Sequence, residues 1–589
     1  MGTIRLRFEQ VRGTDTGIVA IWVAIMTPLL FMFCAFAVDV ARWYVEGERL
    51  QKTVDAASLA GVPSMPQDIV AATAAARDMI TRNGWDLSSS KITIAIGAGA
   101  RPSQLKVTMS STIRNQIAGA FGIPFQTITR TATADFNGPA PMGSPCNVFG
   151  NEPSSSSLPK SIISSFPNCE RNPEFWANIH GPNVWKVQGD QYASRKCKGT
   201  ESGCAGSSTN AANTEFRPEG YYFTVRVKDP ALTGPITVQL YDPAFVNTDS
   251  RCASLPATGF TNGMNTFGND QVARYKNNPL PVAPEPTSFC TGDAWNGGNR
   301  VTSPSGDDTN IPTVTSFGLR KPTDDQVPAN GVPITTCAKQ YDGYDTPSVN
   351  SLKLSSGAYN ATLTSLFHQW VTLCTFTPDP TLKDADYYLQ VRTNVPLGNA
   401  QNVFSQNGDN TSVKGNGSNR FGIRAVSSNG QQVSVAGYER MPIFANSDSS
   451  SSTFNLVRAL PGAAGKKIIF KFFDVGDAAS NGSVQILAPL DGKIGPTGTT
   501  PQPSPTGCVG TGFKNVNLPT CTITGIQNSL GWDGQSQTIE VPIPIDYTCD
   551  FTSNGGCWYR VAVNFGGGAV TDATTWTATI DGDPVRLVQ

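Results

Sequence analysis

The chain has 589 residues, of which 15% are charged, and its formal net charge is -1. A chain of this length is too long to fold around a single hydrophobic core, so several domains are expected. The near-neutral net charge argues against nucleic acid as a partner. With 57 Gly and 42 Pro, the composition favours short strands joined by turns, so most of the protein is expected to be β-rich.

An apolar run near the N-terminus is the first predicted element. Residues 18–38 contain no charged side chain, and as a helix a run of about 20 residues crosses the hydrocarbon core of a bilayer. Pro28 lies inside the run, where membrane helices tolerate proline. We predict a cytoplasmic tail over 1–17 and a transmembrane helix over 18–38.

Two processing events compete with a retained span. Ala35-Phe36-Ala37 fits the small-x-small pattern of a signal-peptidase site, and cleavage after Gly17 would be pilin-type processing. Apolar and small residues, however, recur at spacings of four and three through and beyond the first of these sites, which favours one continuous helix from about Ile18 to Gly61. The helix-packing stripe that follows the run comprises Trp43, Gly47, Leu50, Val54, Ala57 and Gly61. It packs either on the chain's own domain or on a neighbouring subunit.

The number and positions of the cysteines indicate the cellular compartment in which most of the chain folds. Cys34 lies in the apolar run, and the other twelve cysteines are Cys146, Cys169, Cys197, Cys204, Cys252, Cys290, Cys337, Cys374, Cys508, Cys521, Cys549 and Cys557. An even number in a loop-rich region predicts disulfides in an oxidising compartment, and we expect sequential neighbours to pair. Basic residues are balanced across the run, so the cysteines set the orientation: N-terminus inside, bulk of the chain extracytoplasmic.

Several short motifs carry a family resemblance. Pro28-Leu29-Leu30, Asp39-x-x-Arg42, Leu50-Gln51 and Asp55-Ala56-Ala57-Ser58-Leu59-Ala60-Gly61 resemble the N-terminal segment of TadE/TadG-like proteins of the Tad (Flp) pilus-assembly system. The resemblance implies a single-span, pseudopilin-like protein of the bacterial cell envelope that works with other pilus-assembly or pilin-like subunits. Pilins of this system place a glutamate five residues after the leader glycine, but counting from Gly17 this position is Trp22. The difference argues against leader cleavage and favours the TadG-like side of the family.

The remaining chain predicts an α+β protein that becomes mostly antiparallel β. We expect a helical extension over 39–82, a small TadG-like α+β unit over 83–136, and β-rich extracytoplasmic domains over 137–395 and 396–589. These two domains would form one or two β-sandwiches with long disulfide-bonded loops. The segments 221–243 and 466–489 share a strand, an acidic turn and a second strand, which suggests equivalent hairpins in two sandwiches.

Side chains suited to catalysis are scarce. The two histidines, His180 and His368, stand outside any recognisable nucleophile motif, so we predict a protein that is not an enzyme and needs no cofactor. Two pairs of acids, Asp342 with Asp345 and Asp474 with Asp477, lie in loops that could ligate calcium, but none matches a full EF-hand, and turn chemistry is the favoured explanation.

The leading functional hypothesis is therefore a membrane-anchored cell-envelope protein for Tad/Flp pilus assembly or surface adhesion. Its expected partners are the lipid bilayer, other pilus subunits and surface glycans. The alternative is a secreted or anchored carbohydrate-binding protein or glycosidase, because aromatic residues are plentiful and carboxylate pairs could serve hydrolysis.

Overall fold

A computed structural model describes most of the chain. The described residues are 5–65, 69–99, 104–136, 140–144, 146–150, 175–247, 293–295, 311–323, 327–345, 351, 357–367, 370–382, 384–405, 408–429, 432–447, 451–476, 480–495, 498–551, 556–566, 570–580 and 585–588; in the first helix the side chains of 5–18, 29 and 31–35 are not described. The chain divides into two compact units, residues 1–138 with 583–589 (unit 1) and residues 139–582 (unit 2).

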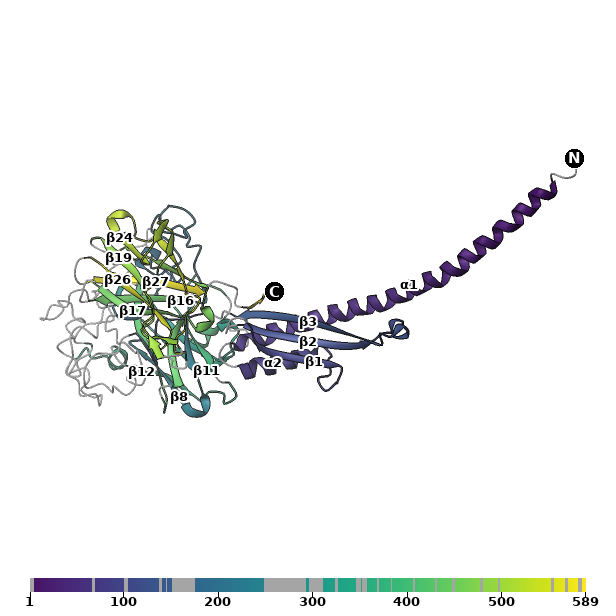
Figure 1. The fold of residues 1–589 in the computed structure, drawn as a ribbon. Helices are drawn as coiled ribbons and strands as arrows, with labels where there is room; N and C mark the ends of the chain where they lie inside the picture. The colour runs from purple at the N-terminus through teal and green to yellow at the C-terminus, as the bar shows by residue number, and fades with distance from the viewer. Residues whose placement is uncertain are drawn as a thin grey trace. The chain divides into compact units, whose positions relative to one another are not determined.

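Two helices and connecting turns form the first part of unit 1. Helix α1 (Arg5–Gly61) is a single helix that continues through Pro28, so the prediction of one helix reaching Gly61 is confirmed, with an earlier start (Figure 1). A 3-10 turn, η1 (Val62–Ser64), carries the chain towards α2 (Ile69–Arg82). Within the described residues, no helix meets the length and apolarity that a membrane crossing requires.

A four-stranded antiparallel sheet completes unit 1. Its order is β1 (Ile92–Ala98), β2 (Gln104–Arg114), β3 (Phe125–Phe136) and β28 (Val585–Val588), and the short helix η2 (Ala118–Phe121) lies between β2 and β3. Buried residues from α1, α2 and the inward positions of β2 share one hydrophobic core. On the other face, hydroxyl pairs such as Thr108 with Thr131 at 3.0 Å link β2 to β3. This alternation of apolar and hydroxyl residues positions one face of the sheet against the helices.

Unit 2 consists of two long antiparallel layers that the strand pairings define. The first layer runs β11 (Pro333–Tyr341), β10 (Thr315–Arg320), β13 (Ala385–Arg392), β7 (Tyr221–Val227), β15 (Val433–Tyr438), β4 (Pro141–Met142), β17 (Ser451–Arg458), β26 (Trp558–Asn564), β19 (Gly482–Leu487) and β24 (Thr522–Ile526). The second runs β12 (Trp370–Phe376), β8 (Ile236–Tyr241), β14 (Gly417–Val426), β6 (Phe175–His180), β16 (Arg440–Ser447), β27 (Val570–Ile580), β18 (Lys467–Phe473), β25 (Ser536–Pro542), β22 (Cys508–Gly512) and β23 (Val516–Leu518).

Shorter elements complete unit 2. Strands β5 (Val148–Phe149) and β9 (Ala294–Trp295) pair with β14, and β20 (Lys493–Gly495) pairs with β21 (Gly498–Thr500). The helices are α3 (Pro230–Thr233), α6 (Ala361–Leu366), η4 (Lys186–Gln188), η7 (Pro328–Asn330), η8 (Ala400–Phe404), η10 (Pro461–Ala463) and η11 (Asn528–Leu530). The chain after unit 1's helices is thus mostly antiparallel β, as predicted.

Aromatic side chains fill the space between the two layers. Phe223 on β7 meets Phe421 on β14 with ring centroids 6.1 Å apart, and Phe454 on β17 meets Trp576 on β27 at 5.7 Å. The inward positions of these strands therefore form a sandwich core.

Two of our expectations about organisation need correction. The boundary expected at 395/396 separates no units, because β14 and β15, which follow it, pair with β8 and β7, which precede it. The last strand, β28, belongs to unit 1 because it pairs with the edge of β3.

The prediction that the segments 221–243 and 466–489 form hairpins is also wrong. Strand β7 lies in the first layer and β8 in the second, and β18 and β19 are likewise divided between the layers. Each segment therefore crosses from one layer to the other. The two segments occupy corresponding places in the sandwich, but their strands do not pair with each other.

Disulfides join parts of unit 2. The bonds are Cys197–Cys204, Cys337–Cys374, Cys508–Cys521 and Cys549–Cys557, all between sequential neighbours. Cys146 is also disulfide-bonded, and Cys169, Cys252 and Cys290 lie outside the described residues. Cys337 on β11 and Cys374 on β12 link the outermost strands of the two layers at one edge. Cys508 on β22 and Cys521, which precedes β24, link the layers near the other edge.

Candidate functional site

Helix α1 holds the β2–β3 loop through one carboxylate. Asp39 is 1% exposed, and its two oxygens accept hydrogen bonds from the backbone N–H groups of Gln116, Ile117 and Ala118, each at 2.8 Å. The bond from Ala118 is the largest influence on the Asp39 carboxyl, and with the other two it holds the pKa below its ordinary value. The ionised carboxylate thus fixes the loop to the helix directly after the apolar run.

Further polar contacts extend this attachment along α1. The indole N–H of Trp43 donates to Asn115 Oδ1 at 2.8 Å, and the Asn115 amide donates to the carbonyl of Ile123 at 2.9 Å. The Ser111 hydroxyl donates to Glu46 Oε1 at 2.6 Å. The loop and the adjoining end of β2 are therefore attached at several points of α1.

The predicted packing stripe lies against unit 1 itself. Leu50, Val54 and Ala57 are completely buried in the core, and Trp43 packs against its margin. At Gly61 a Cβ would lie 2.4 Å from the Ala72 carbonyl oxygen, so the close approach of α1 to α2 requires glycine. Gly47 faces the end of the Arg130 side chain instead. Of the two alternatives, the stripe packs on the chain's own domain.

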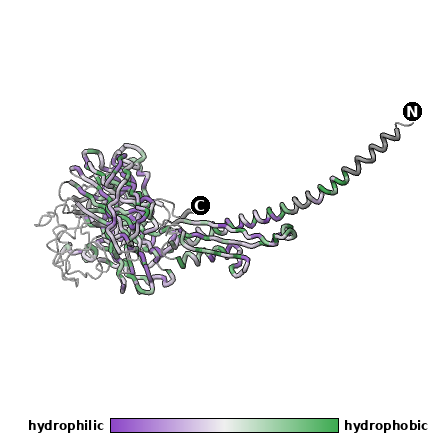
Figure 2. The backbone as a smooth tube through the Cα atoms, viewed as in Figure 1, coloured by the Kyte–Doolittle hydropathy of each residue, from purple (hydrophilic) through white to green (hydrophobic). Residues whose placement is uncertain are grey.

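Apolar side chains are exposed on both sides of the Asp39 contact. In α1 before Asp39 they include Trp22, which is 58% exposed, and Figure 2 colours much of the described part of this stretch as hydrophobic. In the β2–β3 loop, Phe121 is 63% exposed and Ile123 is also exposed, as is Phe125 at the start of β3. Gly17 lies inside α1. Exposed apolar side chains gathered in this way are typical of interaction surfaces.

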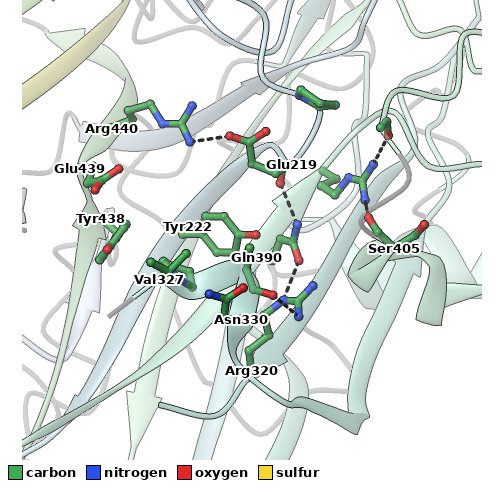
Figure 3. Close-up of a pocket in the computed structure, with 15 residues that line it drawn as sticks. Glu219, Tyr222, Arg320, Val327, Asn330, Gln390, Ser405, Tyr438, Glu439 and Arg440 are labelled. Carbon is green, nitrogen blue, oxygen red and sulfur yellow. Dashed lines mark hydrogen bonds and ion pairs between the residues drawn. The ribbon is translucent and has the colours of Figure 1, made fainter. Parts of the chain in front are cut away.

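Unit 2 contains a pocket of about 410 Å³ on the outward side of the first layer (Figure 3). Its floor comes from neighbouring strands: Tyr222 on β7 is paired in register with Gln390 on β13, and Arg320 on β10 with Tyr388 of β13. The residues between them, Leu389 and Leu319 for example, face the sandwich core. Helix η7, Ser405 and Gly408 wall the floor in, so polar side chains on an outer face become buried.

Two guanidiniums in this pocket are held by neutral oxygens. Arg320 donates to the amide oxygen of Gln390 and to the carbonyls of Ala329, Gly331 and Phe404 at 2.9 to 3.2 Å. Arg392 donates to Asn394 Oδ1 and to the carbonyls of Val403, Ser405 and Gly408 at 2.7 to 3.2 Å. Burial lowers the pKa of both arginines. Among the described residues, no carboxylate forms an ion pair with either.

The rim of the pocket lies at the corner between β15 and β16. Glu439 forms this corner alone, with a φ of 58°, a left-handed backbone that is uncommon outside glycine. Beside it Arg440 pairs with Glu219 at 3.0 Å. Desolvation raises the pKa of the Glu439 carboxyl, and Arg440 opposes that shift. A residue in such backbone next to a pocket is a common feature of functional sites.

Other predicted site residues lie apart from the pocket. Asp342 accepts a hydrogen bond from Gly343 N at 2.9 Å, the Asp345 carbonyl accepts one from Asn247, and buried Asp474 accepts one from Gly534 N at 2.7 Å. Asp477 and His368 lie outside the described residues. Two clusters of potential metal ligands occur within the described residues, but the sulfurs of each, Cys197 with Cys204 and Cys549 with Cys557, are joined in a disulfide. His180 is fully buried, with Nδ1 3.1 Å from Ser194 Oγ.

The pocket is the feature that sequence reasoning missed. The alternation in 385–392 ("ADYYLQVR") was the available signal, since polar Gln390 and Arg392 alternate with apolar residues. That pattern normally marks a solvated face. Only the tertiary structure reveals that η7 and η8 cover it.

Comparison with known proteins bears on α1 and α2. The family model described as "Putative Flp pilus-assembly TadE/G-like" matches residues 17–78. A search of curated proteins found no match. Among solved structures, the Faustovirus major capsid protein aligns over 87% of this chain and 94% of its own with 8% identity, but its TM-score of 0.11 supports no argument about fold or function. The segment of α1 and α2 over residues 17–78 thus matches the TadE/G-like family of Flp pilus assembly.

Proposed function

We propose that this protein is a membrane-anchored component of Flp pilus assembly, with residues 18–38 in the bilayer and unit 2 on the extracytoplasmic side. The family match over residues 17–78 supports the pilus-assembly role. The observation that carries the anchoring is the Asp39 contact: α1 leaves the uncharged run and is fixed at once to a folded unit by three hydrogen bonds.

The β2–β3 loop then lies at the membrane surface. Because Asp39 follows the last residue of the run, the loop that it holds sits at the level of the lipid headgroups. Phe121 and Ile123 are exposed on this loop, and aromatic and apolar side chains are favourable at that level. The loop would therefore support the helix laterally against the bilayer surface.

The disulfides and the scarcity of histidine support the remaining part of the proposal. Disulfides persist in oxidising compartments, which fits an extracytoplasmic unit 2. Because His180 is enclosed in the core, it is poorly placed for catalysis, and we propose that the protein acts by binding partners, including other pilus subunits, in assembly or adhesion.

The anchor is tested by the fate of the full chain in a bacterial host. We expect it to remain with the membrane pellet after carbonate extraction, and unit 2 to be digested by protease added to spheroplasts. The double variant Ile25→Arg/Leu30→Arg should shift the chain to the soluble fraction, because an arginine costs roughly 2.5–3.5 kcal/mol at the centre of a span. Tyr44→Arg, on an exposed residue of α1 beyond Asp39, is the matched control and should stay in the pellet. A mature N-terminus at Ile18 or Val38 would contradict the retained span.

The Asp39 contact gives a second, separate expectation. Asp39→Asn should accelerate amide hydrogen exchange at residues 116–118, because the neutral amide accepts these bonds more weakly than the carboxylate. In the wild type the same protection should be present at neutral pH and be lost as the pH falls below 3.8, since folding lowers the pKa from that value. Exchange rates corrected for the intrinsic pH dependence provide the measurement. Asp55→Asn is the control, because Asp55 accepts from Gln51 within α1. Unchanged exchange in Asp39→Asn would contradict the contact.

A further inference from the structure

The pocket of unit 2 holds two buried guanidiniums, Arg320 and Arg392, that form no ion pair with a described carboxylate. Arg320 and Arg392 are each 3% exposed, and the oxygens that hold them are neutral. Neutral carbonyls satisfy the N–H groups, yet a buried charge without a counter-ion remains costly. An anion entering the pocket would reduce this cost.

Two donors at the pocket are also unused within the described part of the chain. Tyr222 is 5% exposed and its hydroxyl has no hydrogen-bond partner there, and the same holds for Nη1 of Arg440. Both residues line the pocket, and the Glu219 side chain lies next to Arg440 (Figure 3). Buried donors are normally paired, so two unpaired donors at one cavity indicate a missing acceptor.

We propose that this pocket binds a carboxylate-bearing sugar residue of the uronic acid type. The carboxylate would be placed near Tyr222 and Arg440, and the sugar hydroxyls would donate to the carboxylates of Glu219 and Glu439. The volume of about 410 Å³ falls in the range of small-molecule sites.

The charges favour a sugar acid over a phosphate. Among the residues that line the pocket, the guanidiniums of Arg320, Arg392 and Arg440 outnumber the carboxylates of Glu219 and Glu439 by one. Asp409, which also acts on Arg392, is paired with Arg195, so a single positive charge remains to neutralise. A monoanion matches this balance, whereas a phosphate dianion would be repelled by the two glutamates. Carboxylates are in addition good acceptors for sugar hydroxyls, and the rings of Tyr222 and Tyr438 supply apolar surface for a pyranose face.

The test is calorimetric titration of the full-length, detergent-solubilised protein with digalacturonate. Saturable binding is expected, with the dimethyl ester of the same disaccharide binding at least about tenfold more weakly, because the ester removes the charge that the guanidiniums attract. Tyr222→Phe keeps the ring and removes only the hydroxyl, and should weaken binding about fivefold to tenfold. Arg440→Gln should weaken it more than about tenfold, because a hydrogen bond to a charged group is lost.

A second buried tyrosine supplies the matched control. Tyr341 is 6% exposed and its hydroxyl has no partner within the described residues, but it does not line the pocket. Tyr341→Phe should therefore bind digalacturonate as the wild type does. The proposal is overturned if the protein does not bind digalacturonate, if the ester binds equally well, if inorganic phosphate binds as tightly, or if both tyrosine variants lose affinity equally.

Discussion

Gly61→Ala should destabilise the packing of α1 on α2 by about 1–3 kcal/mol, the usual cost of adding a methyl group to a filled core. The new Cβ would lie 2.4 Å from the Ala72 carbonyl oxygen and 2.5 Å from Leu105 Cδ2. The first of these is backbone, so the helices themselves must move apart. Hydrogen exchange in α2, measured on the full chain, should accelerate accordingly.

Gly47→Ala is the matched control for this effect. Its Cβ would lie 2.6 Å from Nη2 of Arg130, which is the end of a flexible side chain and can move away at little cost. Alanine also favours the interior of a helix by roughly 0.5–1 kcal/mol over glycine. This variant should leave exchange in α2 unchanged or slower. If the two alanines accelerate exchange equally, the close contact at Gly61 is not what holds the helices together.

Removing the disulfide between Cys337 and Cys374 should lower the free energy of unfolding of unit 2 by about 4 kcal/mol. The bond closes a loop with a sequence separation of 37, and chain-entropy arguments assign about this much to a loop of that length. Cys337→Ala/Cys374→Ala tests it, with guanidinium unfolding of the full chain as the measurement.

The bond between Cys549 and Cys557 provides the comparison. Its sequence separation is 8, so the same argument gives only about 2.5 kcal/mol for Cys549→Ala/Cys557→Ala. The first double variant should therefore unfold at lower denaturant than the second. The reverse order would show that loop length does not govern these two bonds.

Sequence reasoning succeeded where the pattern was local. The continuity of α1 follows from apolar and small residues that recur at a constant helical spacing from Phe36 to Gly61. The strand β7 follows from the alternation of Phe223, Val225 and Val227 with other residues. The sequential disulfides are local in the same sense, because each closes a short stretch of chain.

Sequence reasoning failed where the strand or residue that an element contacts lies far away along the chain. β14 reads as an amphipathic strand, but its sequence does not reveal that β8, nearly two hundred residues earlier, is its neighbour. The pocket has the same origin: Arg320 and Arg392 read as solvated until η7 and η8 are placed over them. Alternation specifies which face a residue takes, and the tertiary structure decides what covers that face.

The pairing of β28 with β3 has a mechanical consequence. Because residues 583–589 return to unit 1, unit 2 is an insertion whose two ends both leave from the same small sheet. A load applied to unit 2 therefore reaches unit 1 through two chain segments, one continuous with β3 and the other with β28. The pairing of Val585 with Phe136 through Val588 with Thr133 must break before the second of these segments is released. In the membrane anchoring proposed above, unit 2 would thus be held through two chain segments rather than one.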